Sequence, residues 1–311
     1  GTTRKVGELL KKHGPKGTGS EIVANPEFLR EGSAVGDFLR PNRVVIGVEN
    51  EWAREVMRKV YRPLYLIETP IVLTTLETAE LIKYASNAYL ATKISFVNEI
   101  AAIAEAVDAN IDDVAKGMGL DGRIGPKFLH AGIGFGGSCL PKDVSSLVHQ
   151  SNTGGVKPEI LEAVLRVNAR LAGVAVRKVK EQLGDLDGKT IGLLGLSFKP
   201  NTDDLREAPS IRIVQQLLDA KAAVRVFDPA AMKRFEETTE LDVTYCKDAY
   251  DTAQGCNALV LVTEWNEFRV LDFDRLRDAV KEPVFVDCRN VYKPDHVTTH
   301  GFRYTSFGRG R

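Results

Sequence analysis

Residues 190–198, TIGLLGLSF, are the apolar stretch that decides the fold of the second half of the chain. The stretch follows the polar segment GDLDGK at 184–189 and precedes a helical pattern at 210–220. Apolar strands that alternate with helices in this way predict a doubly wound parallel sheet, with ligands at the carboxyl ends of its strands. The other strands predicted in this part are 223–229, 243–246, 257–265 and 283–290, and the other helices are 230–239 and 272–280.

The residues before this sheet divide into two further regions. Residues 76–107 keep a helical apolar period without Pro or Gly, and the helices predicted after them are 112–117, 143–151 and 158–183. Residues 1–75 alternate again, with helices at 3–12 and 51–61 and strands at 21–24, 43–48 and 71–73. The sequence therefore predicts an α/β region over 1–75, an all-helical region over 76–187 and an α/β region over 188–311.

Charge and composition exclude several classes of protein. The 311 residues include 42 Lys and Arg against 42 Asp and Glu, a formal net charge of +0. This balance excludes nucleic-acid binding driven by bulk charge. No apolar run approaches the roughly 18 residues of a membrane span, and the first residues, GTTRKVGELLKKHG, lack the apolar core of a signal peptide. We expect no nucleic-acid and no membrane partner.

The four cysteines are scattered, at positions 139, 246, 256 and 288. None stands in C-x-x-C spacing and no His cluster accompanies them, so no metal site is expected. Scattered cysteines in a long chain fit a reducing cytoplasm better than a disulfide scaffold. If one of them is functional, we expect a nucleophile, and we interpret Cys246, Cys256 and Cys288 as packing residues.

Residues 132–143, GIGFGGSCLPKD, are the most informative stretch for chemistry. Its four glycines allow the backbone to approach a ligand and to expose N–H groups. A thiolate needs a nearby cation or N–H donors, which Lys142 and the loop amides could supply to Cys139. Asp143 follows Cys139 by one helical turn. The alternative is a glycine-rich loop that ends in a structural cysteine.

Two polar pairs in the first half have the spacing of one helical turn. Glu27 and Glu31 lie in NPEFLREGSAVG, and paired carboxylates can act as bases or position water. Lys83 and Asn87 lie in ELIKYASNA and could donate to a developing oxyanion. For both pairs the alternative is a solvated polar face of a helix.

Residues 193–209, LLGLSFKPNTDDLREAP, lie between a predicted strand and a predicted helix, where phosphates bind. Gly192 and Gly195 give G-x-x-G rather than the G-x-G-x-x-G fingerprint, so the motif supports dinucleotide binding poorly. Lys199 and Arg206 could hold a diphosphate, and Arg289 ends the last predicted strand at the same edge of the sheet. A surface role is the alternative for each of these cations.

Four ordered segments together resemble the UDP-glucose/GDP-mannose dehydrogenase family, which includes the UDP-N-acetylmannosamine dehydrogenases. These segments are NPEFLREGSA, AELIKYASNAYLATKISFVNEI, RIGPKFLHAGIGFGGSCLPKD and GLSFKPNTDDLRE. The second is most similar to the members that act on UDP-glucose. The resemblance implies two successive oxidations at C6 of the sugar, from alcohol to aldehyde to acid, with reduction of two NAD.

The resemblance also implies roles for particular residues. Cys139 would attack the aldehyde to give a thiohemiacetal, and a second hydride transfer would give a thioester that water hydrolyses. Lys83 and Asn87 would stabilise the oxyanion. Asp143 would act with water as a base, and Glu27 would assist hydrolysis of the thioester. The remaining implied contacts are Phe28, Leu29 and Arg30 in the sugar pocket, Phe135 and Gly136 over the sugar and diphosphate, Phe198, Lys199 and Arg289 at the UDP, Arg123 in a neighbouring subunit's site, and Glu31, Lys142 and Arg206 toward NAD.

The resemblance also implies an α/β fold of three parts. These are a partial N-terminal Rossmann lobe, a central all-helical dimerisation domain and a C-terminal doubly wound, Rossmann-like domain that binds the UDP-sugar. In the family most of the NAD-binding lobe precedes the residue that matches Gly1, so we do not expect a G-x-G-x-x-G loop in this chain. Residues 76–107 would form the core of a homodimer.

Such a partial lobe would make this chain an inactive fragment that binds NAD weakly or not at all. A truncated chain, one half of a split protein and a retained binding module are three possibilities that stay open. The alternative functions are a non-catalytic module for UDP-sugar binding or oligomerisation, and a dehydrogenase for UDP-N-acetylmannosamine or GDP-mannose.

Overall fold

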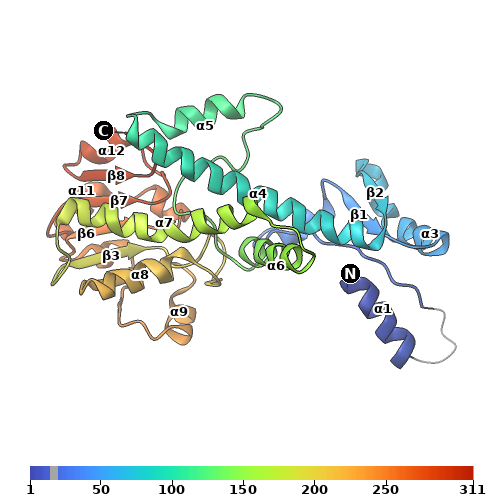
Figure 1. Ribbon diagram of the computed structural model, residues 1–311. Coiled ribbons are helices and arrows are strands. Elements are labelled where there is room, and N and C mark those ends of the chain that lie inside the picture. The colour runs from blue at the N-terminus through green and yellow to red at the C-terminus, as the bar shows by residue number, and fades with distance from the viewer. Residues whose placement is uncertain (15–19, 311) are drawn as a thin grey trace. The chain divides into compact units, whose positions relative to one another are not determined.

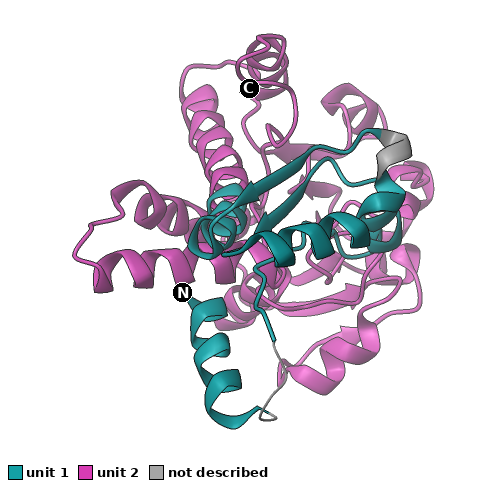
Figure 2. Cartoon of the chain, turned by 90° about the vertical axis from the view of Figure 1, so that its right-hand side faces the viewer, with its two compact units in different colours: residues 1–87 teal, residues 88–311 magenta. Residues whose placement is uncertain are grey.

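The computed structural model describes residues 1–14 and 20–310. The chain divides into two compact units, Gly1–Asn87 and Ala88–Arg311, which Figure 2 colours separately. The division falls inside the helix α4 (Leu76–Ala106) rather than near residue 76, and the second unit contains both the helical region and the C-terminal sheet. The predicted boundaries of the three regions, 1–75, 76–187 and 188–311, therefore stay predictions.

The first unit is a small α/β structure. Its β1 and β2 pair in parallel and are connected through α3, which makes a βαβ unit. All four residues of β1 are buried, with Val45 packed among Leu76 and Ala79 of α4. The elements of this unit are α1 (Thr2–His13), α2 (Ala34–Leu39), β1 (Val44–Gly47), α3 (Glu51–Val60), the 3-10 helix η1 (Arg62–Ile67), β2 (Ile71–Thr74) and the first part of α4.

The second unit begins with helices and continues into a sheet. Every element between residues 76 and 187 is a helix, as predicted. The helices are α5 (Ile111–Gly119), α6 (Cys139–Thr153), α7 (Glu159–Leu183), α8 (Pro209–Asp219), α9 (Met232–Thr238), α10 (Ala249–Ala253), η2 (Asn266–Arg269), α11 (Phe273–Ala279) and α12 (Pro294–Thr298). The strands are β3 (Thr190–Leu194), β4 (Ala223–Phe227), β5 (Thr244–Tyr245), β6 (Ala258–Leu261), β7 (Val284–Asp287) and β8 (Arg303–Ser306).

The six strands of the second unit form one parallel sheet in the order β5-β4-β3-β6-β7-β8 (Figure 1). Counted within this sheet, the order is 3-2-1-4-5-6, the doubly wound order of the Rossmann fold. The prediction of a doubly wound C-terminal domain is confirmed. The strand order reverses between β3 and β6, so a crevice for a ligand is expected at the carboxyl ends of these two strands.

Helices cover both faces of this sheet. Ile191 and Leu193 of β3 pack on the side of α7 and α8, whereas Leu194 packs on the side of α10 and α11. All three side chains are fully buried, which is why the strand is a continuous apolar run in the sequence. In the described residues, 1–14 and 20–310, no helix is both long and apolar enough to cross a membrane.

Several predicted boundaries were wrong. Of the strand predicted at 21–24, only Ala24 pairs, through an isolated antiparallel bridge to Gly47. The loop sequence at 195–198 follows β3 instead of extending it, and α6 begins at Cys139 rather than at Asp143 because Pro141 is tolerated in a first helical turn. The helices α2, α10 and α12 and the edge strand β8 were not predicted.

We predict that Leu193→Ala lowers the free energy of unfolding by about 2–5 kcal/mol, because Leu193 is fully buried in the central strand and truncation leaves a cavity. Denaturant unfolding measures this change. Val270→Ala is the control, since Val270 is 80% exposed and its truncation is expected to change stability by less than about 0.5 kcal/mol. Equal effects of the two substitutions would contradict this description of the core.

Candidate active site

The glycine-rich loop at 132–137 is bound to the carboxyl-terminal edge of the sheet. The Ile133 amide donates to the carbonyl of Cys288, just after β7, at 2.9 Å. The Gly137 amide donates to the carbonyl of Arg206, in the segment between β3 and α8, at 2.8 Å. The loop that leads into Cys139 is therefore fixed to the edge where the fold predicts a ligand.

Two glycines of this loop are required by close packing. Gly134 has φ +84°, and a Cβ there would lie 2.2 Å from Asn168 Oδ1. Gly137 has φ +79°, and a Cβ would lie 2.7 Å from the Phe198 ring. Both positions combine a left-handed backbone with no room for a side chain. Gly136 is similarly confined, since its Cβ would lie 2.5 Å from the carbonyl oxygen of Glu207.

The expectation that this loop offers its N–H groups to a ligand is wrong for at least four of them. The amides of Gly132, Ile133, Phe135 and Gly137 all donate to protein oxygens. Phe135 is also 6% exposed and packs in an apolar cluster that includes Val144 and Val164. The glycines therefore serve close packing of the loop more than exposure of its amides.

Asn168 of α7 is a site residue that the sequence analysis missed. Its Oδ1 accepts from the Phe135 amide and its Nδ2 donates to the Phe135 carbonyl, both at 2.9 Å. One side-chain amide thus satisfies both backbone groups of a loop residue, as a neighbouring strand would. The only signal in the sequence was a single Asn among the apolar residues of the predicted helix at 158–183.

Cys139 is the first residue of α6 and the exposed one of the four cysteines. Its Sγ lies 3.6 Å from Ser138 Oγ. The start of a helix presents unpaired N–H groups and the positive end of the helix dipole, which favour an anion. Asp143 lies one turn further along α6, is 3% exposed and forms an ion pair with Lys142. The helix therefore brings together three predicted site residues.

The other three cysteines are buried, as expected of packing residues. Burial raises the pKa of Cys256 to about 12 and also raises the pKa of Cys246 and of Cys288. These thiols are therefore poor nucleophiles near neutral pH.

Phe198, Lys199 and Arg289 meet at the point where the strand order reverses. Phe198 and Lys199 lie in the loop after β3, and the Lys199 ammonium is 5.3 Å from the centroid of the Phe198 ring. Arg289 follows β7 and donates from Nη2 to the Phe198 carbonyl at 3.0 Å. Its guanidinium also forms an ion pair with Glu264 at 3.1 Å. The fold thus collects the three residues that the sequence analysis assigned to a UDP.

Arg206 is held beside this loop by Asp204. The Arg206 guanidinium donates to both carboxylate oxygens of Asp204, at 2.7–3.0 Å, and its side chain is 58% exposed. Burial raises the pKa of the Asp204 carboxyl, but the hydrogen bonds from Arg206 outweigh burial, so the net effect is a lowered pKa. Asp204 is therefore ionised near neutral pH and keeps the cation oriented.

Within the first unit, the predicted catalytic residues Glu27 and Lys83 lie together. Lys83 Nζ donates to the Glu27 carbonyl at 2.6 Å and to Glu27 Oε1 at 3.0 Å. Asn87 follows Lys83 by one turn of α4. Phe28 lies beside them, with its ring 5.5 Å from Lys83 Nζ and 3.5 Å from the Arg43 guanidinium.

The remaining predicted residues lie on exposed segments. Leu29 donates its amide to Glu27 Oε2 at 2.6 Å. Arg30 pairs with Asp37 at 2.6 Å, and Glu31 is exposed in the turn before α2. Arg123 pairs with Asp121 at 2.6 Å, and its side chain is 90% exposed. The roles of these residues in ligand binding stay predictions.

The expectation that the chain lacks G-x-G-x-x-G spacing is wrong. That spacing occurs at 117–122 and again at 132–137. The first spans the end of α5 and the second precedes α6, so neither follows a strand. Neither therefore has the strand–loop–helix context of a dinucleotide fingerprint.

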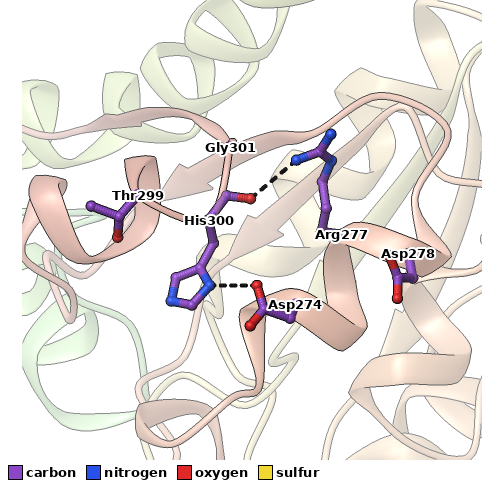
Figure 3. Close-up of a pocket in the computed structure, with 6 residues that line it drawn as sticks. All are labelled: Asp274, Arg277, Asp278, Thr299, His300 and Gly301. Carbon is purple, nitrogen blue, oxygen red and sulfur yellow. Dashed lines mark hydrogen bonds and ion pairs between the residues drawn. The ribbon is translucent and has the colours of Figure 1, made fainter.

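A shallow pocket lies elsewhere on the second unit, between α11, α12 and the start of β8 (Figure 3). His300 Nδ1 lies 2.6 Å from Asp274 Oδ1, and Arg277 donates to the His300 carbonyl at 3.3 Å. None of the predicted site residues lines it. The pocket is therefore separate from the candidate active site.

These features define a class of protein. A Rossmann-like sheet with cations at its switch point is joined by a packed glycine loop to an exposed cysteine at a helix start. This arrangement is typical of a nucleotide-binding α/β protein, and the exposed cysteine is a candidate nucleophile.

Comparison with known proteins identifies the family within this class. Sequence models of the UDP-glucose/GDP-mannose dehydrogenase family match residues 1–65 (NAD binding domain), 77–170 (central domain) and 192–294 (UDP binding domain). The UDP-glucose 6-dehydrogenase of Rhizobium meliloti is 51% identical over 99% of this chain and 71% of its own length. That of Rickettsia bellii is 44% identical over 94% of this chain and 68% of its own.

Solved structures agree. A UDP-glucose dehydrogenase from Pyrobaculum islandicum superposes with a TM-score of 0.88 at 38% identity, over 95% of this chain and 66% of that one. A UDP-D-ManNAc dehydrogenase from Pyrococcus horikoshii superposes with a TM-score of 0.84 at 25% identity, over 99% of this chain and 70% of that one. The chain thus spans about two-thirds of the length of the relatives that it matches.

The chain belongs to the UDP-glucose/GDP-mannose dehydrogenase family. This confirms the predicted class, an NAD-dependent oxidoreductase, and NAD as its cofactor. Because the NAD-binding-domain model matches residues 1–65, the expectation that the chain lacks most of that lobe is not supported, and neither is the expectation of an inactive fragment.

We predict that iodoacetamide modifies one thiol of the folded chain, Cys139, because the other three thiols are buried. At pH 8 a thiol with a pKa of about 12, such as Cys256, is ionised to only about one part in ten thousand. Mass spectrometry of peptides counts the modified sites. Cys139→Ser is expected to abolish labelling in the folded state and to leave three sites after unfolding. Labelling of Cys288 in the folded chain would contradict the prediction.

Proposed function

We propose that this chain carries the activity of a UDP-glucose 6-dehydrogenase, the NAD-dependent twofold oxidation of UDP-glucose to UDP-glucuronate. The main support is the placement of Cys139, which is exposed at the start of α6 directly after a loop bound to the switch point of the UDP-binding sheet. The identity to curated UDP-glucose 6-dehydrogenases supports glucose as the sugar.

The proposed roles of the residues follow the chemistry of the second oxidation. The Cys139 thiolate attacks the C6 aldehyde, and the negative charge that develops on the aldehyde oxygen is stabilised by Lys83 and Asn87. NAD, when bound, would supply the hydride acceptor for each oxidation, and loss of a hydride from C6 of the oxyanion adduct gives the thioester. Asp143 takes a proton from the water that attacks the thioester, and Glu27 assists. The carbon–sulfur bond then breaks, the thiolate leaves and the product is a carboxylate.

The UDP would bind at the switch point of the second unit. Lys199 supplies positive charge for the diphosphate, and Phe198 and Arg289 complete the site. Phe28, Leu29 and Arg30 are proposed to contact the sugar. Phe135 and Gly136, in the loop that leads to Cys139, are proposed to cover the sugar and the diphosphate. This assignment is supported by the meeting of Phe198, Lys199 and Arg289 at one edge of the sheet.

NAD is proposed to bind at two positive charges beside the glycine loop. Lys142 and Arg206 have side chains that are 66% and 58% exposed, and each is oriented by a buried carboxylate, Asp143 or Asp204. Two oriented cations suit the pyrophosphate of a dinucleotide. Glu31 is proposed as a further contact on the cofactor side.

We also propose a homodimer through α4. Tyr89, Phe96 and Ile103 are spaced by seven residues and are 63%, 49% and 51% exposed, which makes an apolar stripe along the helix. Stripes of this spacing pack against one another between helices. Arg123 is proposed to enter the site of the neighbouring subunit. A reducing cytoplasm suits the four free thiols.

Two other functions have some support. The likeness to a UDP-D-ManNAc dehydrogenase supports a different sugar, since pocket shape decides between related sugars. A module that binds UDP-sugar without oxidising it would need only the switch-point residues of the second unit.

We predict that UDP-glucose with NAD yields NADH, followed at 340 nm, and that UDP alone raises the melting temperature. UDP at 100 times its Kd should stabilise the chain by about 2.7 kcal/mol. Cys139→Ser should lower acid production by about 1,000-fold or more and leave the UDP shift unchanged, because Cys139 lies outside the proposed UDP site. A UDP shift without NADH would favour the binding module, and turnover of a ManNAc substrate alone would favour the other sugar.

We predict a dimer in light scattering at micromolar concentration. Phe96→Glu should give monomers, because it places a charge in the middle of the apolar stripe. Val270→Glu is the matched control, since Val270 is 80% exposed and is not part of α4. A monomeric unaltered chain, or dissociation by both substitutions, would contradict the proposed interface.

A further inference from the structure

Asp228, directly after β4, is a buried carboxylate on which six hydrogen bonds converge. It is 1% exposed. Its Oδ2 accepts from the amides of Leu196 and Ser197 at 2.7 and 3.0 Å, from Ser197 Oγ at 3.0 Å and from Trp265 Nε1 at 3.1 Å. Its Oδ1 accepts from the amides of Ala230 and Ala231 at 2.9 and 2.8 Å. One side chain therefore binds three separate segments of the chain.

Asp228 lies at a position of the sheet where other Rossmann domains bind a ligand. The carboxyl end of the second strand of a Rossmann sheet, here β4, is where dinucleotide-binding domains hold a ribose through an acidic side chain. A carboxylate offers about four lone-pair directions, and the six protein donors fill them. In a dinucleotide-binding domain the acidic group at this position binds a ribose. In this chain it binds the neighbouring loop instead.

The loop that Asp228 holds is the one that leads to the proposed UDP contacts. Gly195 donates its amide to the Phe227 carbonyl at 2.8 Å, and Thr263 Oγ1 donates to the Ser197 carbonyl at 2.5 Å. The Phe198 amide donates to the Asp204 carbonyl at 3.1 Å. The four backbone amides of residues 195–198 thus all donate to protein oxygens. Asp228 accepts from the middle two, those of Leu196 and Ser197.

We propose that Asp228 is a positioning residue for the UDP-sugar, one that fixes residues 195–199 so that Phe198 and Lys199 meet the nucleotide diphosphate. This proposal rests on the proposed function of the switch point as the UDP site. A carboxylate is needed because every contact of Oδ1 and Oδ2 is with a donor. An amide in its place would turn an NH2 group toward N–H groups and leave them unpaired in a buried site.

Asp228→Asn tests the proposal, with Asp248→Asn as the matched control. Asp248 also accepts a helix-capping amide in this unit, from Asp251 at 2.7 Å, and Asn caps helices as well as Asp does. We expect Asp228→Asn to weaken UDP binding in calorimetry by about tenfold or more, to raise KM for UDP-glucose with kcat within about twofold, and to speed hydrogen exchange at Leu196 and Ser197. The control should change none of these.

Two milder variants keep the test decisive if Asp228→Asn fails to fold. Trp265→Phe and Ser197→Ala each remove one side-chain donor and leave the backbone amides in place, so each should weaken UDP binding by a factor of about 2–5. A purely structural role would lower the melting temperature of the variants and leave UDP affinity unchanged well below it, which would overturn the proposal. If the unaltered chain binds no UDP, the proposed function fails, and hydrogen exchange then decides whether Asp228 holds the loop.

Discussion

The guanidinium of Arg289 connects three segments of the second unit that surround its proposed site. Arg289 donates to the carbonyls of Val262, Phe198 and Gly134, at 2.7, 3.0 and 3.3 Å. These carbonyls belong to the residue after β6, the loop after β3 and the glycine loop before Cys139. Each would cost about 1–3 kcal/mol if it were buried without a donor. The position of Cys139 relative to this edge of the sheet therefore depends in part on this planar cation, together with the bonds from the glycine loop to the carbonyls of Cys288 and Arg206.

The same edge is organised by carboxylates at the ends of strands. Asp287 ends β7, is fully buried and accepts from the amides of Arg289 and Tyr292 at 2.9 and 3.0 Å and from the Tyr304 hydroxyl at 3.0 Å. Burial raises the pKa of Asp287, although these hydrogen bonds oppose the rise. Asp228, directly after β4, likewise accepts hydrogen bonds from loop amides. Parallel strands place such residues at one edge of the sheet, so these two aspartates fix loops at the edge where a nucleotide is proposed to bind.

The sequence predicts this sheet well because its inner strands are continuous apolar runs, a pattern typical of strands that are buried on both faces. The edge strand β8, RYTS, was missed because it mixes exposed and half-buried residues and resembles a loop. The glycine-rich segment indicated Cys139 and the predicted strand topology indicated Arg289, whereas Phe198 was assigned only through the family resemblance. The sequence could not predict Asn168, whose partner Phe135 is 33 residues away, because only the packed fold brings the two together. The expectation that the glycine loop offers its N–H groups to a ligand was wrong for the same reason, because the oxygens that bind these groups are distant in the sequence.

The pairing of Glu27 with Lys83 limits how the first unit can act. The ammonium is 17% exposed and donates to a carboxylate that is 57% exposed, so the charge of a half-buried lysine is already compensated before any substrate arrives. A developing oxyanion in the same place would replace one oxygen acceptor by another. Such an exchange keeps an oxygen acceptor beside the ammonium throughout, and it avoids the cost of leaving a cation unpaired away from water. The resting ion pair therefore holds the ammonium in one orientation, which would preorganise Lys83 for the oxyanion role proposed for it.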